Sequence, residues 1–66
     1  MVTLYTIHCP QCNVIEKKLE KANIPFGIVE GIEPIRQLGF LSAPILKVED
    51  KCMTFKEACE WIKEQQ

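Results

Sequence analysis

The fold is decided by the stretch Val2-Thr3-Leu4-Tyr5-Thr6-Ile7-His8-Cys9-Pro10-Gln11-Cys12 near the start of the chain. Residues 2–7 alternate in polarity and are rich in β-branched and aromatic side chains, which is the pattern of a strand. Two cysteines follow, separated by two residues, and apolar residues at helical spacing begin directly after them. The stretch therefore predicts a strand that delivers a pair of cysteines to the start of a helix.

The helix after the cysteines is predicted over residues 12–22. Its apolar positions Ile15, Leu19 and Ala22 recur at helical spacing, and Pro25 ends the pattern. The other face is charged, with the residues Glu16, Lys17, Lys18, Glu20 and Lys21. Lys17 and Lys18 have two interpretations, because such lysines either form the solvated face of a helix or recruit acidic partners.

The position of the first cysteine predicts its chemistry. Cys9 is expected at the helix N-terminus, where unpaired backbone N–H groups and the helix dipole favour a thiolate and lower the pKa. Pro10 suits the first turn because its missing N–H would have no partner there. Cys12, one turn later, is expected to face inward beneath Cys9. We therefore predict that Cys9 attacks a disulfide and that Cys12 resolves the mixed disulfide.

Other roles for the cysteines fit the sequence less well than a redox site. Zinc needs about four ligands, and the remaining candidates His8, Cys52 and Cys59 show no second paired spacing. A purely structural disulfide would close too short a loop to stabilise the chain much. An iron–sulfur cluster or zinc ion shared between two chains is the alternative function, and an adaptor protein with a vestigial site is a third. His8 either tunes the Cys9 thiolate or faces solvent without a role.

Composition limits the class of protein. The chain has 66 residues, 47% of them hydrophobic, so one domain over residues 1–66 is expected, as a monomer. Its net charge is −1, from 8 basic and 9 acidic residues, which predicts no nucleic-acid surface. The apolar runs are too short for a membrane span, and the N-terminus lacks a signal-peptide pattern, so a cytoplasmic protein is expected.

The rest of the chain predicts three more strands and two more helices. Residues 26–30 form a strand that pairs in parallel with the first through a right-handed crossover, and a short helix begins at residues 32–34. Residues 45–48 and 52–53 form a hairpin, and Thr54 with Glu57 makes a capping box for the last helix. Cys52 and Cys59 fall on positions expected to face the core, where they would act as small buried hydrophobes.

This order of elements resembles the glutaredoxin branch of the thioredoxin fold over essentially the whole chain. Two motifs carry the resemblance: Cys9-Pro10-Gln11-Cys12, similar to the active site of that family, and Leu38-Gly39-Phe40-Leu41-Ser42-Ala43-Pro44-Ile45, similar to its cis-proline segment. The resemblance implies an α/β fold of order β-α-β-α-β-β-α, with a four-stranded mixed sheet and helices on both faces. It also implies a cis peptide bond between Ala43 and Pro44.

The function implied by the resemblance is reduction of protein disulfides by a small dithiol oxidoreductase. Pro10, Gln11, Ala43 and Pro44 would contact the substrate, with thioredoxin reductase or glutathione as electron donor and no resident cofactor. Glutaredoxins that use glutathione commonly have an aromatic residue where this chain has Gln11, and a Gly-Gly pair with an Asp where it has residues 52–55. Gln11 and the cis-proline segment are more similar to small glutaredoxin-like redoxins, which pass electrons to ribonucleotide reductase. Those redoxins usually carry a Trp-Ser-Gly-Phe-type stretch before the last helix, which this chain lacks, so both subfamilies stay open.

Overall fold

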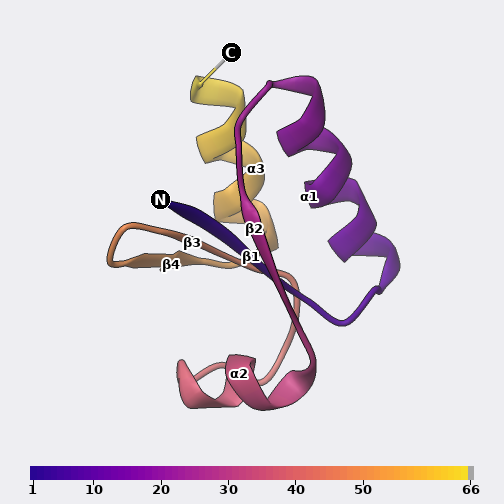
Figure 1. Cartoon of the computed structure of the whole chain (residues 1–66), viewed down its shortest axis with the longest axis vertical. Helices are drawn as coiled ribbons and strands as arrows, with labels where there is room; N and C mark the ends of the chain where they lie inside the picture. Colours follow the sequence, from indigo (N-terminus) through magenta and orange to yellow (C-terminus); the bar gives the residue numbers. More distant parts are fainter. Residues whose placement is uncertain (66) are drawn as a thin grey trace.

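The computed structural model describes residues 1–65, and Gln66, the last residue of the predicted domain, lies outside the described residues. Strands and helices follow one another in the predicted order β-α-β-α-β-β-α (Figure 1). The elements are β1 (Val2–Thr6), α1 (Pro10–Lys21), β2 (Gly27–Glu30), α2 (Ile32–Gln37), β3 (Ile45–Val48), β4 (Lys51–Met53) and α3 (Phe55–Glu64). Within residues 1–65, every helix is too short or too polar to cross a bilayer.

The four strands form one open, mixed sheet in the order β2-β1-β3-β4. β1 pairs in parallel with β2, as a connection through a helix requires, and antiparallel with β3. β3 and β4 form the antiparallel hairpin. β1 is therefore a central strand, and the loop that carries the cysteines leaves from its C-terminal end.

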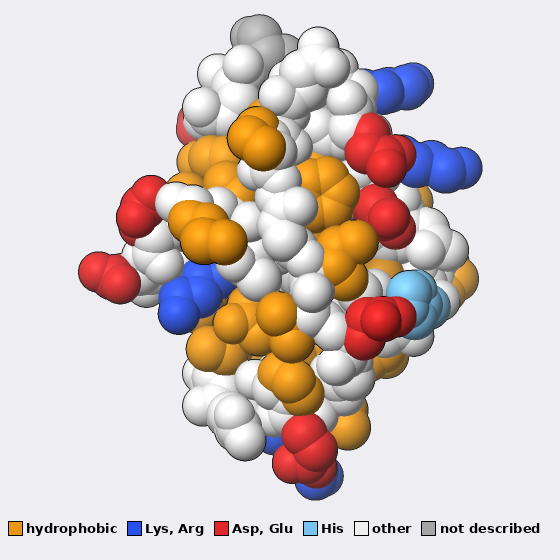
Figure 2. All heavy atoms as spheres, viewed as in Figure 1, with side chains coloured by type: hydrophobic (Ala, Val, Ile, Leu, Met, Phe, Trp, Pro, Cys, Tyr) orange, Lys and Arg blue, Asp and Glu red, His pale blue; other side chains and the backbone are white. Residues whose placement is uncertain are grey.

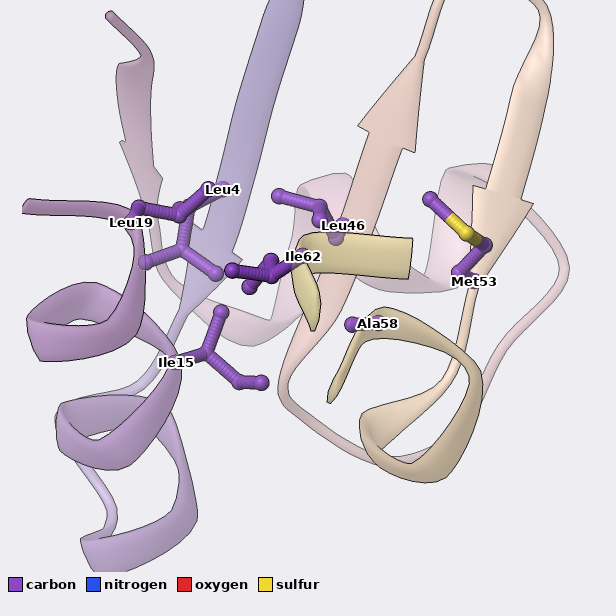
Figure 3. Packing of buried hydrophobic residues seen from close by; sticks show 7 residues of the cluster. All are labelled: Leu4, Ile15, Leu19, Leu46, Met53, Ala58 and Ile62. Carbon is purple, nitrogen blue, oxygen red and sulfur yellow. The ribbon is translucent and has the colours of Figure 1, made fainter. Parts of the chain in front are cut away.

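The main core lies between the sheet and the two longer helices, α1 and α3. Its fully buried side chains come from both strands and helices (Figure 3): Leu4, Ile15, Leu19, Leu46, Met53, Ala58 and Ile62. Leu4 and Leu46 are paired in register on β1 and β3, and the side chains of Leu4, Ile15 and Ile62 point toward one another. Burying one such Leu or Ile contributes about 1.5–3 kcal/mol, so this cluster holds both helices against β1.

Helix α2 lies on the opposite side of the sheet from α3 (Figure 1), so helices are present on both faces. Its fully buried residue is Ile35, which is outside the main core cluster. Gly31 enters the helix at φ 106°, a conformation that residues with a Cβ rarely adopt. Pro34 lies in the first turn, where its missing N–H leaves no hydrogen bond unmade.

Several boundaries differ by one or two residues from the sequence prediction, and among them β1 ends at Thr6, α1 ends at Lys21 and β4 begins at Lys51. α1 begins at Pro10 rather than at residue 12, because Cys9 is the N-cap and its sulfur accepts a hydrogen bond from the Cys12 N–H. β2 begins at Gly27 rather than at residue 26, because Gly27 is the first residue that pairs with β1. Asn23, which follows the end of α1, is in the left-handed conformation with φ 56°.

Two isoleucines provide a matched test of this core. Ile62 is 1% exposed in the cluster, whereas Ile28 on the edge strand β2 is 48% exposed. Ile62→Val should lower the free energy of unfolding by about 0.5–1.5 kcal/mol because it removes a buried methylene group. Ile28→Val should change it by less than about 0.5 kcal/mol. Urea denaturation measures both, and equal losses would contradict this description of the core.

Candidate active site

The two cysteines of the CPQC motif, residues 9–12, lie where β1 passes into α1. His8 turns the chain with φ 62°, and Cys9 then takes an extended conformation as the N-cap. The Cys12 N–H donates to the Cys9 sulfur over 3.3 Å, so the thiol replaces the oxygen that usually caps a helix. Local structure alone therefore holds Cys9 at the helix end.

The sulfur atoms of Cys9 and Cys12 are 2.6 Å apart. A disulfide bond needs about 2.05 Å, so the pair can close with little movement. Cys9 is half-buried, whereas Cys12 is only 1% exposed and faces the interior with Ile15 and Leu19. An external reactant can therefore reach Cys9 but not Cys12.

The expected lowering of the Cys9 pKa is wrong. Burial of Cys9 and its hydrogen bond to the Cys12 side chain raise the Cys9 pKa. Burial also opposes ionisation of Cys12, but hydrogen bonds with Cys9, the Thr6 side chain and the Ile7 backbone outweigh it and lower the Cys12 pKa. Ionisation is therefore opposed at Cys9 and favoured at Cys12. The helix end alone predicts a lowered pKa at Cys9, but groups at the end of β1 act on Cys12 in the folded protein.

Thr6 is the site residue that sequence reasoning missed. It is the last residue of β1 and its side chain is 4% exposed. Its Oγ1 accepts a hydrogen bond from the His8 N–H at 2.9 Å, and its carbonyl accepts one from the Gly31 N–H at 3.0 Å. The signal in the sequence was a threonine on the same strand face as Leu4, immediately before the cysteine loop. Thr6 thus joins the cysteine loop to the turn that follows β2.

His8 is paired with Glu30 at the surface. Thr6 and Glu30 are register partners on β1 and β2, which brings the Glu30 carboxylate beside the imidazole of His8. A hydrogen bond to Glu30 and the charge of that carboxylate raise the pKa of His8. The structure therefore pairs the exposed imidazole of His8 with Glu30, a partner that neither interpretation of His8 included.

The second motif lies beside the first. The peptide bond between Ala43 and Pro44 is cis, as the resemblance implied. Tyr5 pairs with Ile45 across β1 and β3, and continuing that antiparallel register by one residue puts Pro44 opposite Thr6. Pro44 is buried and Ala43 half-buried. The fold therefore brings the cis-proline segment to the end of β1 from which the cysteines depart.

The rim of the site is exposed and partly apolar. Pro10 and Gln11 are exposed on the first turn of α1. Ile7 in the cysteine loop is exposed, and Leu41, before Ala43, is 84% exposed. All the predicted site residues thus lie on the two segments that meet at the end of β1.

The other two cysteines lie away from this site. Cys59 is on α3 and packs against the main core, as predicted. Cys52 was expected beneath α3, but strands alternate their faces and its neighbour Met53 already fills the core position, so Cys52 faces the other side. Among residues 1–65, no three side chains of His, Cys, Asp or Glu are grouped to hold a metal ion.

The contribution of Thr6 to the dithiol can be measured by a pH titration. Thr6→Val keeps the shape but removes the hydroxyl group that helps to lower the Cys12 pKa. We expect the first ionisation of the reduced pair, followed by thiolate absorbance in the ultraviolet, to move to higher pH. Thr6→Ser retains a hydroxyl group and should titrate close to the wild-type protein. If Thr6→Val leaves the midpoint in place, the hydroxyl group does not stabilise the thiolate.

Comparison with known proteins does not assign this chain to a family. A scan against models of protein families found no match, and a search of curated proteins found none. The chemical indications of function are therefore those of the site itself: an accessible sulfur at Cys9, a buried sulfur at Cys12 in contact with it, and a cis-proline segment alongside.

Proposed function

We propose that this protein is a small dithiol oxidoreductase of the glutaredoxin type that reduces disulfides in proteins. The supporting observation is the pair of sulfur atoms 2.6 Å apart, of which one is accessible and the other almost fully buried. The α/β order and the mixed sheet are compatible with the thioredoxin-like fold that the resemblance implies. Such a pair cycles between a dithiol and a disulfide without an organic cofactor.

The first step is attack by Cys9 on a sulfur atom of the target disulfide. When the pair holds one proton, that proton can pass along the contact between the two sulfur atoms, which puts the thiolate on accessible Cys9. The target S–S bond breaks and a bond between Cys9 and the target forms. The second target sulfur leaves as a thiolate and takes a proton from solvent or from a nearby acid.

The second step completes the transfer of two electrons from the dithiol to the target. Cys12 loses its proton, and its thiolate attacks the Cys9 sulfur from the buried side. The mixed disulfide breaks, a bond between Cys9 and Cys12 forms, and the second target thiol is released. The target has gained two electrons and two protons, and the protein has been oxidised. Thioredoxin reductase or glutathione would then reduce the disulfide.

The substrate would lie across the two segments at the end of β1. The backbone of Ala43 would pair with an extended peptide, while Pro10, Gln11 and Pro44 would shape the groove. Exposed Ile7 and Leu41 would contact apolar side chains next to the target disulfide. A protein of this kind works where thiols are kept reduced, as in the cytoplasm, and a reductase such as ribonucleotide reductase is a fitting acceptor.

Serine variants test the two roles. Cys9→Ser should abolish reduction of a protein disulfide, because no accessible thiol remains at the active site. Cys12→Ser should accumulate a mixed disulfide through Cys9, visible by mass spectrometry. The assay supplies electrons from thioredoxin reductase with NADPH, or in parallel from glutathione with its reductase. Cys52→Ala with Cys59→Ala is the control and should retain turnover. Full activity of Cys9→Ser, or bound metal without reductase activity, would overturn the proposal.

Alkylation tests the order of access independently of any substrate. In the reduced protein at neutral pH, iodoacetamide should label Cys9 well before Cys12. The reason is that the sulfur of Cys12 is buried and iodoacetamide cannot reach it. Transfer of a proton from Cys9 to Cys12 would form a thiolate on Cys9, which the reagent can reach. Peptide mapping after short reaction times identifies the labelled residue. Labelling of Cys12 first would reverse the proposed roles.

A further inference from the structure

One exposed face of α1 forms a stripe that starts at the active site. The stripe consists of Val14, Lys17, Lys18 and Lys21, which are spaced three and four residues apart and are all exposed. These four residues line a shallow depression of about 430 Å³. Gln11, one turn before Val14, continues the stripe to the first turn of α1, directly after Cys9.

The three lysines of this stripe form no ion pair within residues 1–65, although acidic side chains (red) lie beside them in Figure 2. Among residues 1–65, the ion pairs are those of the N-terminus with Glu49, His8 with Glu30, and Arg36 with Glu33. No carboxylate in that part of the chain lies within ion-pair distance of Lys17, Lys18 or Lys21. Lysine side chains (blue) project outward on the α1 side of the molecule (Figure 2). Since the whole chain has a net charge of −1, this positive surface is a local feature.

A neighbouring depression extends the surface toward α3. It has a volume of about 460 Å³ and is lined by Lys18 together with Cys59, Glu60, Ile62 and Lys63. Lys63 thus adds a fourth cation, although Glu60 lies beside it. The positive surface is strongest on α1 itself and weakens toward α3.

We propose that the lysine stripe docks an acidic, extended segment of the protein substrate next to its target disulfide. This inference rests on the proposed function. α1 has 12 residues and is therefore about 18 Å long, which matches about five or six residues of an extended peptide. Such a segment would place Glu or Asp side chains near the three lysines, and Val14 would contact an apolar residue between them. A basic segment would be repelled from the same surface.

Three peptides that differ only in charge test this docking. Each carries the same disulfide and a flanking segment rich in Glu, Gln or Lys, and kcat/KM is measured for reduction by the whole protein. We expect the acidic peptide to react about tenfold faster than the basic one, the lower end of electrostatic steering. The difference should shrink as salt is raised, because exposed charges are screened.

Matched variants locate the effect. Lys17→Gln combined with Lys18→Gln and Lys21→Gln should remove the preference and leave the neutral peptide unaffected. Lys47→Gln combined with Lys51→Gln and Lys56→Gln removes the same charge from β3, β4 and α3, and should retain the preference. Equal rates for the three peptides, or equal loss in both triple variants, would overturn the docking proposal.

A binding measurement distinguishes failure of the docking proposal from failure of the proposed function. Fluorescence anisotropy with a labelled acidic peptide, in which serines replace the cysteines, reports docking without any redox step. Binding that is lost in the α1 triple variant supports docking even if no peptide is reduced, in which case the proposed function alone fails. Absence of binding, or tighter binding of single-stranded DNA than of the acidic peptide, would overturn the docking proposal while leaving reduction of the neutral peptide unaffected.

Discussion

Burial of Leu4 at the centre of β1 is the interaction on which the rest of the structure depends. Its side chain is in contact with the cluster formed by α1, α3 and β3, so it fixes both helices against one strand. Two residues further on the same face, Thr6 is brought beneath the start of α1. The dithiol is therefore positioned by the core itself: if β1 moved relative to α1, Thr6 and Cys12 would separate.

Two effects on Cys9 oppose each other at the N-terminus of α1. The N-terminus of α1 places Cys9 as its cap, yet burial and the neighbouring thiol oppose ionisation there. Polar groups at the end of β1 stabilise charge on Cys12 instead. In the proposed mechanism, the charge is needed on Cys9 for the attack and on Cys12 for the resolution, and the contact between the two sulfur atoms would allow a proton to pass between them. Access, rather than a lowered pKa, makes Cys9 the proposed nucleophile.

The proposed chemistry and the proposed docking surface are joined by α1. Its first turn carries the reactive thiols, its buried stripe of Cys12, Ile15 and Leu19 packs on the core, and its exposed stripe carries the lysines. One rigid element would thus orient the nucleophile and contact the substrate beyond the disulfide. A chain of 66 residues has little surface, so it is reasonable that one helix serves both purposes.

Local patterns determined much of this protein. Every strand and helix was predicted from signals that depend on neighbours in the sequence. These signals are the change from alternating to helical spacing around Cys9, the prolines and the capping box of Thr54.

The tertiary structure decided the properties that depend on distant residues. The pKa order of the cysteines follows from the closeness of β1 to α1, the partner of His8 follows from strand register, and Cys52 turns away because Met53 takes the core position. Burial and electrostatics are set by groups far apart in the chain, so only the folded arrangement could reveal them.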